Sequence, residues 1–229
     1  MKANFNKINP RGDARRRKRM AGISLVEVII VLVIIGVLSA ISLPYIYQYK
    51  KLYKTEDQAL KVTDLMREAS QLAITRRRTF RLEIDPNANL LMLIDEGTVL
   101  AGAADDTEIK AIPLEARNEV RLDIMPTGVT APNPPSYADA VFAVDAIGHQ
   151  RNGATVIGNT VWSVRFNRDG TVFNNAGNVV SATLYFFPPL TPGNAAPRSL
   201  TEVRAITVFG GSGAVRFWKF NGSAFVAYN

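Results

Sequence analysis

The chain carries an almost uninterrupted apolar run directly behind a strongly basic N-terminal segment. Residues 23–43 are 21 consecutive positions whose only charged side chain is Glu27. As an α-helix, this run would extend about 31 Å, which matches the roughly 30 Å thickness of a bilayer's hydrocarbon core. The sequence therefore predicts one membrane-spanning helix near the N-terminus.

The distribution of charge predicts the orientation of this helix. Residues 1–22 hold eight basic residues and one acidic residue, whereas residues 23–229 hold 19 of each sign. The formal net charge of +7 therefore lies entirely in the N-terminal segment. Because positive flanks stay on the cytoplasmic side, we expect a cytoplasmic N-terminus and a C-terminal part outside the cytoplasm.

The composition excludes most enzyme classes. The chain has no cysteine, which excludes disulfides, thiolate zinc sites and cysteine nucleophiles. Its one histidine, His149, is expected to be an exposed loop residue in the Pro-, Gly- and Asn-rich stretch 127–160. Asp105, Asp106 and Glu108 lack the spacing of an EF-hand loop and are expected to form a solvated turn. No catalytic residue, metal site or cofactor is predicted, and the chain is not expected to be an enzyme.

The junction between the basic and apolar runs differs from an ordinary secretory signal. Such a signal has a shorter apolar core, and its small-residue cleavage site follows that core. Here the small residue, Gly22, precedes the apolar run. The alternative is a signal anchor that contains a glycine by chance. A carboxylate within a membrane span is expensive and usually has a partner, so Glu27 argues against that alternative.

The junction instead resembles the class III signal of type IV pilins and pseudopilins. The resemblance is carried by residues 19–22, Arg-Met-Ala-Gly, and residues 23–27, Ile-Ser-Leu-Val-Glu. It implies that a prepilin peptidase cleaves after Gly22 and N-methylates Ile23, where the family more often has phenylalanine. It also implies that Glu27 pairs with the amino terminus of a neighbouring subunit during filament assembly.

The same resemblance implies a location and a set of partners. The protein would sit in the inner membrane as a single-pass protein, with its C-terminal domain in the periplasm, and would then enter a pilus or pseudopilus. Its partners would be the prepilin peptidase, other pilins or pseudopilins, and the lipid of the inner membrane. A different class of protein, an unprocessed single-pass envelope protein, would keep residues 1–22.

Two small or rigid residues add to the resemblance. Gly36 and Pro44 fall where many pilins carry a glycine and a proline. Because proline lacks a backbone N–H, Pro44 is expected to kink or loosen the helix just beyond the membrane.

One long helix is predicted from about Ile23 to about Arg77. Its first part, 23–43, would span the membrane, and its second part, 44–78, shows apolar residues at helical spacing and would pack on a globular domain. The basic run 76–78 suits a helix C-terminus, where cations are favoured by the helix dipole. A nucleic-acid patch is the alternative interpretation of that run.

From Thr79 onward, the apolar period changes from helical to alternating. Apolar residues at 80, 82 and 84 alternate with Arg81 and Glu83, a pattern typical of a strand. We expect an α+β protein whose long helix packs on an antiparallel β-sandwich-like domain over residues 79–229. The predicted strands are 80–84, 90–94, 109–114, 120–125, 161–166, 171–173, 182–187, 203–209, 214–220 and 224–228. The stretch 127–160 is expected to be a surface insertion with one strand at 141–144.

The order of these elements resembles the GspH/FimT branch of the pilin-like family. The resemblance rests on the long helix, the first strand, the stretch 164–170 and a glycine turn between two strands at 206–216. Members of this branch are minor pseudopilins of type II secretion and minor pilins of type IV pili. The expected function is therefore that of a minor pilin or pseudopilin.

A DNA-binding role is the alternative within the same branch. Some FimT-like proteins bind DNA through a glycine-arginine-any-arginine turn, and here Ala214 replaces the first arginine between Gly213 and Arg216. Arg216 and Lys219 would be the phosphate contacts. The competing interpretation places the neighbouring aromatic residues 217, 218 and 220 in the core and leaves both cations solvated. We favour it, because residues 23–229 carry no net charge to steer a polyanion.

Overall fold

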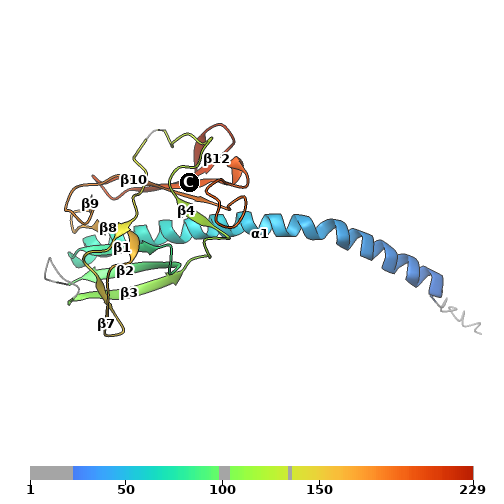
Figure 1. Ribbon diagram of the computed structural model, residues 1–229, viewed down its shortest axis with the longest axis horizontal. Helices are drawn as coiled ribbons and strands as arrows, with labels where there is room; N and C mark the ends of the chain where they lie inside the picture. The colour runs from blue at the N-terminus through green and yellow to red at the C-terminus, as the bar shows by residue number, and fades with distance from the viewer. Residues whose placement is uncertain (1–22, 98–103, 134–135, 229) are drawn as a thin grey trace, which may run out of the picture. The chain divides into compact units, whose positions relative to one another are not determined.

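The computed structural model describes residues 23–97, 104–133 and 136–228 (Figure 1). The chain divides into two compact units, Met1–Tyr45 and Ile46–Asn229. The N-terminal helix α1 (Leu25–Arg76) belongs to both of them. It is followed by β1 (Phe80–Asp85), β2 (Leu90–Glu96), β3 (Asp106–Pro113), β4 (Arg121–Asp123), β5 (Ala143–Val144), β6 (His149–Arg151), β7 (Ala154–Val156), β8 (Thr160–Phe166), β9 (Val172–Phe173), β10 (Ala182–Phe187), a 3-10 helix η1 (Leu200–Glu202), β11 (Arg204–Val208), β12 (Val215–Phe220) and β13 (Phe225–Tyr228).

The second half of α1 presents one apolar face to the β-rich unit. Its buried apolar positions recur every three or four residues, as expected for one face of a helix, and are Ala59, Val62, Leu65, Met66, Ala69 and Ala73. The helix ends where Arg77 adopts a left-handed conformation with φ of 54°. The Arg78 N–H then donates to the Ala73 carbonyl over 3.3 Å. This six-to-one bond is the mark of a Schellman cap.

The first sheet has the strand order β5-β8-β1-β2-β3-β6-β7, and β9 pairs with β8. Its pairs are antiparallel except for β3 and β6, which meet in parallel at Thr107 and Gln150. Between β1 and β2, the Asp85 carboxylate accepts backbone N–H bonds from Asn87 and Ala88, each over 2.8 Å. This Asx turn starts the hairpin that the residues Asp-Pro-Asn-Ala-Asn predict.

The second sheet has the order β13-β12-β11-β10-β4, and both of its faces are buried. One face joins the cluster that also contains α1 and the inner face of β1, β2 and β8. The other face packs in a separate cluster with Val129 and Leu200. Phe217 lies in the first cluster and Trp218 and Phe220 lie in the second, so all three are core residues, as predicted.

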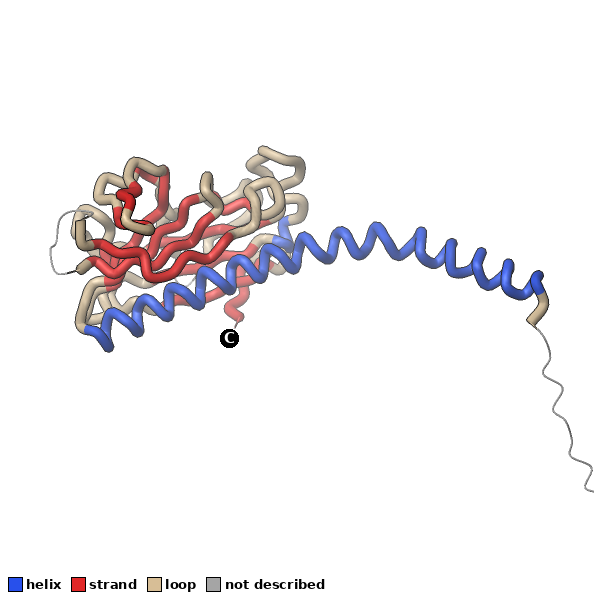
Figure 2. Tube along the Cα trace, turned by 90° about the horizontal axis from the view of Figure 1, so that it is seen from below, coloured by secondary structure: helices blue, strands red, loops and turns tan. Residues whose placement is uncertain are grey.

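The helix and both sheets therefore share one apolar core, which confirms the α+β organisation. Figure 2 shows the second half of α1 running along the strands of this unit. Each leucine or phenylalanine buried there contributes about 1.5–3 kcal/mol to stability.

The stretch 127–160 is a part of the sheet rather than the surface insertion expected from the sequence. It contains β5, β6 and β7, and β6 extends the first sheet beyond β3. The same stretch contacts the outer face of β1, because the Arg81 guanidinium reaches the Gly148 carbonyl. The Pro- and Gly-rich composition of the stretch indicated turns correctly but did not indicate this contact.

Candidate functional site

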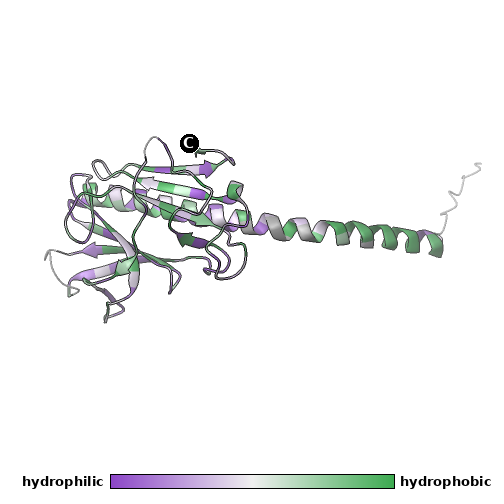
Figure 3. Cartoon of the chain, turned by 45° about the horizontal axis from the view of Figure 1, so that its top comes forward, coloured by the Kyte–Doolittle hydropathy of each residue, from purple (hydrophilic) through white to green (hydrophobic). Residues whose placement is uncertain are grey.

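The N-terminal unit presents a continuous apolar surface. Every described residue from 23 to 43 is exposed, and the part Leu25–Leu43 is long and apolar enough to cross a membrane. Figure 3 shows this apolar stretch along the first half of α1. Exposing so much apolar surface to water is unfavourable, so this stretch is suited to an apolar environment.

Glu27 lies in the first turn of α1, on this apolar surface. Its side chain is exposed, and the first turn of a helix favours a negative charge because the helix dipole is positive there. Ile23 precedes the helix and is 77% exposed. The chain thus places an exposed carboxylate four residues after the position that becomes the amino terminus if cleavage follows Gly22. Gly22 itself lies outside the described residues.

Gly36 and Pro44, which add to the resemblance to pilins, both lie within α1. At Gly36, an added Cβ would have no heavy atom within 4 Å, so the helix surface is open there for the approach of another chain. Pro44 lies next to the boundary between the two units, and the helix continues through its position. The kink expected at Pro44 stays a prediction.

Arg216 and Lys219, the two cations of the DNA-binding alternative, both lie on β12. Side chains alternate along a strand, so positions three apart project from opposite faces of the sheet. Lys219 Nζ pairs with Glu56 Oε1 at 2.6 Å and lies 3.8 Å from the centre of the Tyr228 ring. Its charge is therefore already engaged within the fold, which corrects the expectation that it is merely solvated. Arg216 is exposed.

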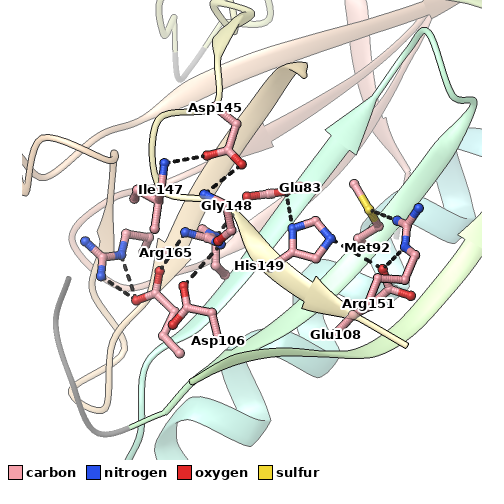
Figure 4. A network of polar contacts seen from close by, with 12 residues as sticks. Glu83, Met92, Asp106, Glu108, Asp145, Ile147, Gly148, His149, Arg151 and Arg165 are labelled. Atoms are coloured by element: carbon pink, nitrogen blue, oxygen red, sulfur yellow. Dashed lines mark hydrogen bonds and ion pairs between the residues drawn. The ribbon is translucent and has the colours of Figure 1, made fainter. Parts of the chain in front are cut away.

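A cluster of buried charged side chains on the outer face of β1 contradicts two expectations (Figure 4). His149 is 1% exposed and lies in β6, so it is not an exposed loop residue. Asp106 is 2% exposed and begins β3, so it does not belong to a solvated turn. Burial raises the pKa of Asp106 to about 6, against the opposing effect of the Arg81 charge.

Arg81 is the centre of this cluster. Its side chain is 0% exposed, with nitrogens 2.9 Å from Glu83 and 3.2 Å from Asp106. Another nitrogen lies 3.5 Å from Glu96, which also pairs with Arg165 at 2.5 Å. The alternation along β1 indicated that Arg81 and Glu83 share one face. It gave no sign that another segment of the chain covers that face.

Residues 17–43 match the family model described as the prokaryotic N-terminal methylation motif. The comparisons with curated proteins and with solved structures gave no match. The motif supports a type IV pilin-like protein that is processed by prepilin peptidase and assembles with other pilins.

Proposed function

We propose that this protein is a minor pilin or pseudopilin of the GspH/FimT type. It is cleaved between Gly22 and Ile23, methylated at Ile23, and assembled into the pseudopilus of a type II secretion system or into a type IV pilus. Before assembly, the helix 25–43 holds it in the inner membrane, with the β-rich unit in the periplasm.

The observation that carries this proposal is the methylation motif on a fully exposed apolar helix that holds one carboxylate. A helix that only anchors a protein gains nothing from Glu27, because a carboxylate in hydrocarbon is costly. A helix that packs among identical or related helices can offset that cost with a cation from its neighbour.

The chemistry at the cleavage site supplies such a cation. Cleavage after Gly22 creates a positively charged amine on Ile23, and N-methylation keeps its charge. In a low-dielectric surrounding, the attraction between this amine and the Glu27 carboxylate of another subunit is much stronger than in water. Because each subunit carries both groups at a fixed spacing, the pair would set the axial register of subunits in the filament.

The β-rich unit supports a structural role more than a DNA-binding role. Residues 23–229 have equal numbers of basic and acidic residues. Lys219 is held by Glu56, and Arg216 lies on the opposite face of β12. A DNA surface instead needs several cations on one face.

The test of this proposal is the incorporation of Glu27→Ala into filaments. We expect the variant to be processed and inserted in the membrane at the wild-type level, but to be depleted at least tenfold from sheared filaments. Ser42→Ala is the matched control, because Ser42 also lies in the apolar stretch but its hydroxyl bonds within its own helix, to the Leu38 carbonyl at 2.8 Å. Wild-type incorporation of Glu27→Ala would contradict the proposal.

A further inference from the structure

The buried cluster on the outer face of β1 contains a group of potential metal ligands. Glu83, Asp145 and His149 each offer one ligand atom, and these atoms all lie within 4.8 Å of one another. The three side chains come from β1, from the segment that precedes β6, and from β6 itself. Figure 4 shows the three side chains close together. Their exposed fractions are only 1%, 3% and 1%, respectively.

Carboxyl groups lie beside both ring nitrogens of His149. Its Nδ1 lies 3.4 Å from Glu83 Oε2, and its Nε2 lies 3.6 Å from Glu108 Oε2. Neither nitrogen has a hydrogen-bond partner among the described residues. A neutral imidazole carries a proton on one nitrogen and a lone pair on the other. In the neutral form one lone pair would therefore face a carboxylate directly, a repulsion that either a second proton on the ring or a bound cation would remove.

The carboxylates around this position are held by other groups. Glu108 accepts a bond from Arg151 Nε over 2.7 Å. Asp145 accepts the backbone N–H groups of Ile147 and Gly148, each over 3.0 Å. These contacts orient the carboxylates and leave lone pairs free. Such support behind the ligands is typical of metal sites.

The two oxygens of Glu83 face different neighbours. Oε1 lies 2.9 Å from Arg81 Nε, whereas Oε2 faces His149. Neither oxygen has a hydrogen-bond partner among the described residues, although the side chain is buried. Because Arg81 pairs with Oε1, the Oε2 oxygen, which faces His149, is available to a further cation.

The carboxyl groups in the cluster outnumber the arginines. The arginines are Arg81, Arg151 and Arg165, and the carboxyl groups are those of Glu83, Glu96, Asp106, Glu108 and Asp145. A bound cation would add positive charge where carboxyl groups are in excess.

We propose that Glu83, Asp145 and His149 Nδ1 bind one divalent transition-metal ion of the zinc type. Two ligands at the usual distance of about 2.1 Å from a tetrahedral zinc ion are about 3.4 Å apart, which is the separation of His149 Nδ1 and Glu83 Oε2. The Nε2–H would then point at Glu108, as in the carboxylate–histidine–zinc arrangement. The ion would fasten residues 145–149 to β1 and so serve a structural role.

The experiment uses the full-length protein in detergent, prepared without a histidine tag and stripped with EDTA. Because His149 is the only histidine of the chain, labelling histidine with ¹⁵N gives signals from one imidazole. We expect Zn²⁺ to shift the Nδ1 resonance and to saturate at one equivalent. We also expect calorimetry to show saturable binding of one Zn²⁺ per chain.

Variants connect this binding to the proposed ligands. His149→Gln and Asp145→Asn should each weaken Zn²⁺ binding at least tenfold. Glu56→Gln, which removes a carboxylate charge from the separate pair with Lys219, should leave binding unchanged. If the ligand variants fail to fold, the imidazole spectrum of the wild-type protein alone tests whether His149 binds Zn²⁺. Three outcomes would overturn the proposal. The first is an unchanged Nδ1 resonance, and the second is an imidazole that holds protons on both nitrogens with excess Zn²⁺ present. The third is saturation by Ca²⁺ but not by Zn²⁺.

Discussion

Replacing Arg81 by methionine should lower the free energy of unfolding by about 3–5 kcal/mol, the usual cost of removing one partner from a buried ion pair. The Arg81 side chain is 0% exposed and lies within 3.5 Å of three carboxyl groups. Methionine keeps much of the apolar stem but removes the charge and the bond to Gly148. Glu83 and Asp106 would then be buried without the cation that faces them now.

The stability lost in Arg81→Met should increase as pH rises. Burial raises the pKa of Asp106 to about 6 even against the opposing Arg81 charge, so without Arg81 this carboxyl holds its proton to a still higher pH in the folded state. The unfolded state therefore loses its protons first as pH rises, and the variant becomes less stable. The difference in stability between the wild type and Arg81→Met should be larger at pH 8 than at pH 5.

The assay is urea unfolding of the full-length protein in detergent and EDTA, followed by tryptophan fluorescence. Both tryptophans, Trp162 and Trp218, are 4% exposed, so their emission should report the loss of the core. Arg67→Met is the control: its pair with Asp64 spans 3.9 Å at the surface, and its loss should cost less than about 0.5 kcal/mol. A loss below about 1 kcal/mol for Arg81→Met, or an equal loss at both pH values, would refute the reasoning.

Three further predictions concern Asp106, Gly213 and the DNA-binding alternative. The folded-state pKa of Asp106 is raised from 3.8 to about 6, so its proton stabilises the fold fully below pH 3.8, and this contribution, about 3 kcal/mol at most, is lost as pH rises through 6. The melting temperature of Asp106→Asn should therefore fall less between pH 4 and 7 than that of the wild type, and equal slopes would contradict this. Gly213→Ala should cost about 1–3 kcal/mol in urea unfolding, because φ is +64° and a Cβ would lie 2.8 Å from the Gly170 carbonyl oxygen; unchanged stability would contradict it. The protein freed of residues 1–22 should not shift duplex DNA at low salt and micromolar concentration, whereas a shift that is lost in Arg216→Ala with Lys219→Ala would favour the DNA-binding alternative.

Local patterns predicted the elements of the fold well. The apolar residues at 80, 82 and 84 gave a strand because their alternation reflects the pleat of the backbone itself. The helical spacing from position 62 to position 73 likewise indicated the face of α1 that is buried. Both signals come from residues that are neighbours in the chain, so a single sequence carries them.

The polar cluster could not be predicted, because its partners are distant in sequence. Arg81 and Gly148 are 67 positions apart, and Glu96 and Arg165 are 69 positions apart. An alternating strand separates two faces but does not tell whether water or another segment covers the polar one. The charged residues Asp145 and Arg151, in a stretch otherwise rich in turns, were the one sign that this stretch meets a charged partner.

The most direct test of the central claim is the intact mass of the protein isolated from the membrane of its host. A pilin-like protein should have lost residues 1–22 and gained one methyl group on Ile23, and Gly22→Val should keep the full precursor mass. A mature N-terminus at any other residue, or a wild-type protein that retains its basic leader, would contradict the account.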